Sequence, residues 1–144
     1  MKMSLRTERW YPFVIAFAAG IVWWNLKLPL PNSIKEFLSS AISLGAILTG
    51  FIATAQAILA ALPTDTVMGR LRASGFIDDL ICYVAAALYG CLIFSGYSIA
   101  GFFWDGRLPL WYGAFWIALA AFSVTCFHRV SRMFFKILRW VPSA

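Results

Sequence analysis

Residues 37–62 read FLSSAISLGAILTGFIATAQAILAAL, a stretch that contains no charged residue and is followed by Pro63. About 20 apolar residues in a helix are enough to cross the hydrocarbon core of a bilayer. A strand hairpin is excluded, because in lipid its edges would leave backbone groups without hydrogen-bond partners. The stretch therefore predicts a transmembrane helix, and its length indicates a helical membrane protein.

Three further apolar stretches of similar length accompany this one. The predicted fold class is all-α, with four transmembrane helices that form one domain over residues 1–144, at about 10–26, 37–62, 80–104 and 108–127. The prolines at 29 and 31 disfavour helix in the residues before them and place a turn between the first two spans. A first span that begins at Trp10 puts Pro12 in its first turn, where a missing N–H costs little.

The composition excludes a water-soluble globular protein. Of the 144 residues, 62% are hydrophobic and 12% are charged, whereas soluble domains carry about 25% charged residues. A net charge of +6 is also found in nucleic-acid-binding proteins. Here the cations lie at the ends of apolar stretches, so we expect the lipid bilayer as a partner and no direct binding to nucleic acid.

The positive charges predict an orientation. If the N-terminus, the 63–79 loop and the C-terminal tail lie on one side, that side holds nine of the twelve Lys and Arg residues, namely Lys2, Arg6, Arg9, Arg70, Arg72, Arg129, Arg132, Lys136 and Arg139. Positively charged loops remain in the cytoplasm. We therefore predict a multi-pass protein of the bacterial inner membrane with both termini in the cytoplasm.

The second span carries a continuous face of small side chains. They recur at steps of three and four residues and are Ser43, Ala46, Gly50, Ala53 and Ala57, with Ser39 and Ala60 at the ends. Small faces let helices approach closely in a membrane. The face is explained either by packing within one four-helix bundle or by a subunit interface or pore lining. Thr49 and Gln56 lie beside it and are candidates for interhelical hydrogen bonds or a polar lining.

Two basic segments are candidates for contacts on the cytoplasmic side. The loop that contains Arg70 and Arg72 predicts a short helix at the headgroup level or a solvated connector. The tail, residues 128–141, predicts a separate amphipathic helix whose basic face includes Arg129, Arg132, Lys136 and Arg139. Such a face binds anionic headgroups or a cytosolic partner protein.

The chain lacks the residue patterns of catalysis and of ion-coupled transport. No span has an ionisable Asp, Glu, Lys, Arg or His near its middle, as coupled transporters generally need. No zinc-protease motif, nucleophile elbow or glycine-rich phosphate loop is present. The cysteines lie inside apolar stretches without a CxxC pair, at Cys82, Cys91 and Cys126. We expect no enzyme, no cofactor and no metal site.

Residues 45–56 read GAILTGFIATAQ, and residues 70–75 read RLRASG. Over about residues 40–90, this pattern resembles small multi-span proteins of bacterial anti-phage defence operons. The resemblance implies a homo-oligomeric membrane component that acts with a soluble partner, so we expect an inner-membrane effector or membrane-sensing subunit. The alternatives are a holin-like autonomous pore and a channel or carrier for an uncharged solute, lined by Thr49, Gln56 and Ser95.

Overall fold

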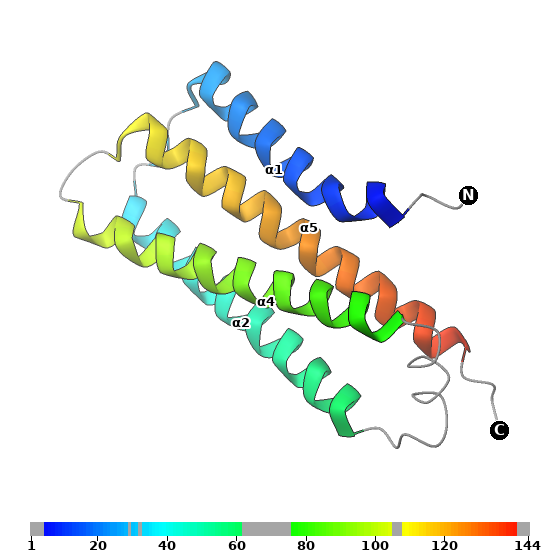
Figure 1. Ribbon diagram of the computed structural model, residues 1–144. Helices are drawn as coiled ribbons and strands as arrows, with labels where there is room; N and C mark the ends of the chain where they lie inside the picture. Colours follow the sequence, from blue (N-terminus) through cyan, green and yellow to red (C-terminus); the bar gives the residue numbers. More distant parts are fainter. Residues whose placement is uncertain (1–4, 29, 32, 62–75, 105–107, 141–144) are drawn as a thin grey trace.

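The computed structural model describes residues 5–28, 30–31, 33–61, 76–104 and 108–140. Within these ranges all regular structure is helical (Figure 1), and the elements are α1 (Leu5–Leu26), α2 (Ile34–Ala61), α4 (Phe76–Ala100), the short 3₁₀ helix η1 (Gly101–Phe103) and α5 (Leu110–Trp140). The predicted all-α fold class is confirmed.

Three of the predicted spans coincide with helices that are long and apolar enough to cross a membrane. Their apolar parts cover Ile34–Ile58, Leu80–Phe103 and Leu110–Phe135. The first predicted span coincides with a shorter apolar stretch, Trp10–Leu26, which lies inside the 22-residue helix α1.

Helix α1 begins earlier than the sequence pattern predicts. It starts at Leu5, so Pro12 lies inside the helix and not in its first turn. The ring of Pro12 is fully buried. The missing N–H removes one backbone hydrogen bond, and the helix continues through the proline to Leu26.

Helix α5 corrects the prediction of a separate amphipathic helix over 128–141. The structure has one uninterrupted helix of 31 residues, which continues from the fourth span to Trp140. The reason is local, because no glycine or proline follows Gly113 until Pro142. At 1.5 Å per residue the helix is about 46 Å long, more than the roughly 30 Å of a hydrocarbon core. The predicted loop helix that contains Arg70 and Arg72 lies outside the described residues.

The four long helices form an open row. Helix α1 packs along α5, α5 packs along α4, and α4 packs along α2 (Figure 1). Successive helices run in opposite directions, so α1 begins at the same end of the molecule at which α5 ends. Helices α1 and α2 are therefore the edges of the row, and each has one long helix as its main neighbour.

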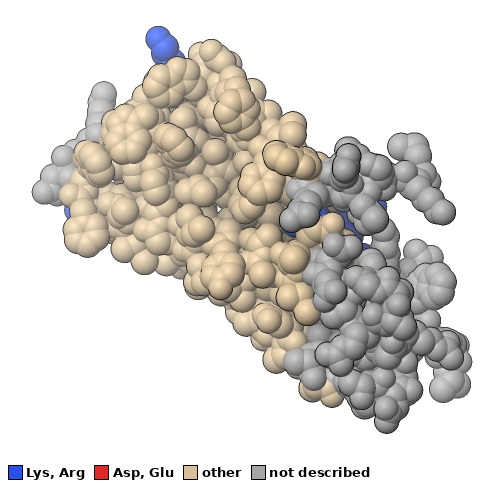
Figure 2. Space-filling view, viewed as in Figure 1, with Lys and Arg blue, Asp and Glu red and all other residues tan. Residues whose placement is uncertain are grey.

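Helix α4 contributes to both clusters of buried side chains. One cluster is formed where α2 ends and α4 begins, around Ile52, Val84 and Cys126. The other lies at the opposite end of the row, around Leu38, Phe94 and Trp116. The outer surface is rich in exposed Phe, Trp, Ile and Leu, and Figure 2 shows a long surface of described residues without ionic side chains.

Candidate functional site

Helix α2 contacts α4 through one face that is nearly flat at its centre. Leu38, Ala41 and Ile52 are buried on this face. Gly45 lies between them, and a Cβ atom built there would come within 2.1 Å of the Ser95 Oγ atom. A side chain at Gly45 would therefore require the Ser95 hydroxyl to turn away, since the other neighbouring atoms of α4 lie at ordinary contact distance.

The predicted small-residue face of α2 points away from this contact. Its members are all exposed, namely Ser43, Ala46, Gly50, Ala53 and Ala57, together with Ser39 at its start. A Cβ atom built at Gly50 would have no other atom within 4 Å. We call this surface the small stripe. Within the described residues the small stripe takes no part in packing the chain against itself.

The rest of the exposed surface of α2 has a different character. It carries large apolar side chains, which are Leu44, Ile47, Phe51 and Ile58. At about 100° per residue these positions and the small stripe form two separate sectors of the helix. Helix α2 therefore has three faces: one buried against α4, one exposed with large side chains and one exposed with small side chains.

The hydroxyl groups near the small stripe are bonded to the helix's own backbone. Ser43 donates to the carbonyl of Ser39 at 3.0 Å, and Thr54 donates to that of Gly50 at 2.8 Å. These hydroxyls need no external partner. From Ser43 onward the stripe can therefore be covered by an apolar surface without leaving the Ser43 hydroxyl unpaired.

Two of the three polar residues proposed for a solute path lie at Gly45. Thr49 donates to the carbonyl of Gly45 at 2.8 Å and is half-buried. Ser95 is packed between α2 and α4 against Gly45. Gln56 is exposed on α2, seven residues after Thr49. The solute path stays a prediction.

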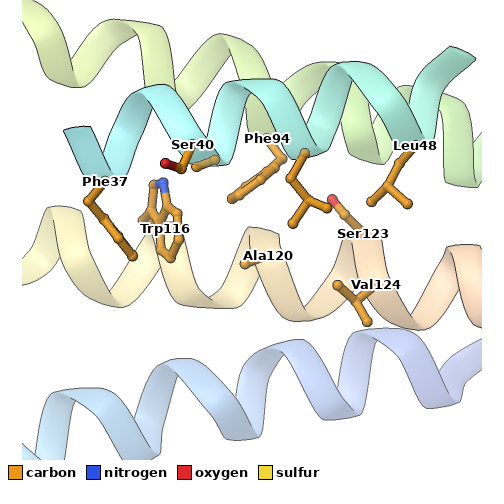
Figure 3. Close-up of a pocket in the computed structure, with 10 residues that line it drawn as sticks. Phe37, Ser40, Leu48, Phe94, Trp116, Ala120, Ser123 and Val124 are labelled. Carbon is orange, nitrogen blue, oxygen red and sulfur yellow. The ribbon is translucent and has the colours of Figure 1, made fainter. Parts of the chain in front are cut away.

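A groove between α2 and α5 was not predicted from the sequence. It has a volume of about 230 Å³, and Figure 3 shows side chains of both helices facing one another across it, with Phe94 of α4 behind. The hydroxyl of Ser40 donates to the carbonyl of Glu36, and that of Ser123 to the carbonyls of Gly90 and Leu119. With its hydroxyls already bonded, the groove offers an apolar surface.

A set of polar contacts between α4 and α5 also escaped prediction. The indole Nε1 of Trp116 donates to the Ser98 Oγ atom at 2.9 Å, and this hydroxyl donates to the carbonyl of Phe94. Tyr112 donates to the carbonyl of Tyr97, and the two rings are stacked with centroids 4.5 Å apart. These pairs are far apart in the sequence, so no local pattern predicts them.

The predicted basic face of the tail is divided by the structure. Arg129 is only 7% exposed, and its guanidinium lies 3.9 Å from the centre of the Tyr83 ring. Its assignment as a headgroup or partner contact is therefore wrong, because α4 covers it. Arg132 is exposed, as the prediction requires. The Arg70 and Arg72 residues, and the side chains of Lys136 and Arg139, lie outside the described part.

The cysteines and acidic residues form no recognisable chemical centre in the described residues. Cys91 and Cys126 are buried, Cys82 is exposed, and all three are free thiols. Within the described ranges, no three His, Cys, Asp or Glu side chains gather as a metal ion would need. Comparisons with protein-family models, curated proteins and solved structures find no match.

Proposed function

We propose that this chain is a four-span subunit of a homo-oligomer in the bacterial inner membrane. The fourth span, in addition to the three long apolar helices, is α1. This assignment is supported by the packing of α1 along α5. The Tyr11 hydroxyl donates to the carbonyl of Thr125 at 3.0 Å, and Trp23 packs against Gly113 near the other end of α1. Both partners belong to the apolar part of α5, Leu110–Phe135. The apolar part of α1, Trp10–Leu26, extends about 26 Å, and the whole helix about 33 Å.

Four antiparallel helices return the chain to the side on which it began. Nine of the twelve Lys and Arg residues then belong to that side, which the positive-inside rule assigns to the cytoplasm. Lys27 and Lys35 lie at the opposite end of the row, next to the connection between α1 and α2. In this orientation both termini are cytoplasmic.

The observation that supports self-association most is the small stripe. Lipid tails are as apolar as leucine, so the hydrophobic effect does not select which helix faces meet in a bilayer. Small residues do, because they let backbones approach and gain van der Waals contacts. Two of the large exposed side chains of α2 lie beside α5, since Leu44 lines the groove and Phe51 packs on Phe127. The small stripe is exposed, and the hydroxyl of Ser43 within it is already bonded, so the stripe suits another helix.

Within the cell we assign to this oligomer the role that the resemblance of residues 40–90 implies. It is an effector or membrane-sensing subunit of a phage-defence system, and a soluble cytosolic partner contacts its basic side, where Arg132 is exposed. Expression beside its neighbouring genes is expected to reduce phage plating, and expression alone to be harmless. Toxicity of the chain alone would instead support a holin-like pore. Solute flux in liposomes that Gln56→Leu abolishes would support a carrier.

The interface is tested by a pair of matched substitutions. Gly50 and Gly96 are both inside helices, and neither has another atom within 4 Å of a built Cβ. Gly50→Leu adds a bulky side chain to the small stripe, whereas Gly96→Leu adds the same side chain to an exposed face of α4. We expect Gly50→Leu to weaken association at least about tenfold, roughly 1.4 kcal/mol, and Gly96→Leu to leave it unchanged. The measurement is oligomer mass in detergent and in nanodiscs, and equal behaviour of the two variants would contradict the interface.

A further inference from the structure

The outer face of α1 carries large side chains at the spacing found in the small stripe. Its exposed members are Trp10, Val14, Phe17, Ile21 and Trp24, with exposures between 44% and 72%. They follow one another at alternating steps of four and three residues. Pro12, which is buried where α1 packs on α5, lies on the other side of the helix. We call this surface the large stripe.

The small stripe of α2 has the same alternating steps, from Ser39 through Ser43, Ala46, Gly50 and Ala53 to Ala57. A repeat of seven residues made of steps of four and three is the pattern by which two helices pack side by side with a small crossing angle. Large side chains on one helix fill the spaces above small residues on the other. The two stripes are thus complementary in size and in period.

The two stripes also lie at matching depths in the row. At one end, a series of side-chain contacts from α1 to α2 shows which residues are level with one another. Trp23 packs on Gly113, and the adjacent Tyr112 reaches Gly101, where Leu38 of α2 also lies. Trp24 is therefore about level with Ser39.

The other half of the row gives the same register. The ring of Phe13 packs at a tilt against that of Phe122, which lies against Gly90. Gly90 is five residues from Ser95 along α4, and Ser95 meets Gly45. Five residues along α2 in the same direction lead to Gly50. Phe13 and Val14 are therefore about level with Gly50.

The small stripe and the large stripe are on the two edge helices of the row, and α5 and α4 separate them. One copy cannot bring its own two stripes together without dismantling the row. We propose that the large stripe of α1 in one copy packs on the small stripe of α2 in the next copy. This contact rests on the self-association proposed above. Copies related by an axis along the membrane normal keep α1 antiparallel to α2. In this register Phe17 meets Ala46, Val14 meets Gly50 and Ile21 meets Ser43.

This contact is head-to-tail, since it joins two different surfaces. Any open assembly leaves one large stripe and one small stripe uncovered at its ends. A head-to-tail contact covers every stripe only when the copies close into a ring. The assembly therefore consists of closed rings, with α1 and α2 of neighbouring copies at every junction.

Cysteine cross-linking in membranes tests this arrangement. In a Cys82→Ala background, the remaining Cys91 and Cys126 are buried. Phe17→Cys together with Ala46→Cys is expected to give a ladder of dimers, trimers and larger species on oxidation, because each copy joins two neighbours. Each single variant is expected to give none. The matched control is Phe17→Cys with Gly96→Cys, which places the second thiol on an exposed face of α4 and is expected to stay uncross-linked.

The outcomes separate this inference from the proposed function. Dimers from Ala46→Cys alone would show that α2 meets α2, which overturns the head-to-tail contact and leaves self-association intact. A wild-type chain that is monomeric in nanodiscs would overturn both. A second pair, Val14→Cys with Gly50→Cys, repeats the test. If the wild type is oligomeric but neither pair gives a ladder, the contact alone is overturned.

Discussion

Two glycines of the same helix have opposite surroundings. A Cβ at Gly45 would overlap the Ser95 Oγ atom at 2.1 Å, whereas a Cβ at Gly50 would meet nothing within 4 Å. The sequence pattern places Gly50 in the small-residue face that predicts a helix contact, and Gly45 outside it. It does not predict which one contacts α4, because in a bilayer a lipid-facing surface and a protein-facing surface are both apolar. Only the position of α4 distinguishes them.

The closeness of α2 and α4 at Gly45 is tested by a double-mutant cycle. Gly45→Ala is expected to destabilise the folded chain by less than about 1 kcal/mol, because the Ser95 hydroxyl must turn away while alanine favours the helix. Ser95→Ala removes the Oγ atom that the new methyl group would meet, while the Ser95 Cβ atom is 3.4 Å away. The double variant is therefore expected to regain most of the stability, measured by reversible unfolding in mixed micelles. Equal destabilisation with and without Ser95→Ala would show that the helices are not this close.

At the scale of an element, α5 shows where sequence reasoning stops. Its span and the direction of its chain were predicted, but its continuation to Trp140 was not. The charged residues after Phe127 indicate a helix that has left the membrane. The absence of a glycine or proline between Gly113 and Pro142 lets the helix continue, and the contact between Arg129 and Tyr83 packs the continued part against α4. A cation on an aromatic face contributes about 0.5–2 kcal/mol to this packing.

A proline at His128 distinguishes the two forms of this region. If α5 is continuous, His128→Pro removes a backbone hydrogen bond inside the helix and costs about 3 kcal/mol. If a span ended at 127 and a separate helix followed, a proline at the boundary would be tolerated. We expect His128→Pro to lower stability in the micelle unfolding assay. His128→Ala serves as the control, since the side chain of His128 is exposed and its removal leaves the backbone hydrogen bond in place. Equal stability of the two variants would contradict the continuous helix.

For the whole molecule, the number, length and helical nature of the apolar segments follow from their composition, because the bilayer fixes how long a span must be. The order of neighbours does not. The chain places α5, and not α2, beside α1, through contacts such as Tyr11 with Thr125 that join residues far apart in sequence. The residues of the small stripe were identified from spacing alone. Their exposure, and the large stripe at the opposite edge, become visible only in the row.

The open row is the reason for proposing that copies of this chain associate. Its two edge helices carry complementary stripes that a single copy cannot unite. If the proposed ring forms, the assembled ring, and not the single subunit, is the unit that a cytosolic partner contacts.

The most direct measurement is a particle image of the wild-type chain in lipid nanodiscs. We predict closed rings in which α2 of each copy is covered along its small stripe by a neighbouring copy, with both termini on one face of the disc. Single copies whose Gly50 and Ala46 face lipid would contradict the central claim.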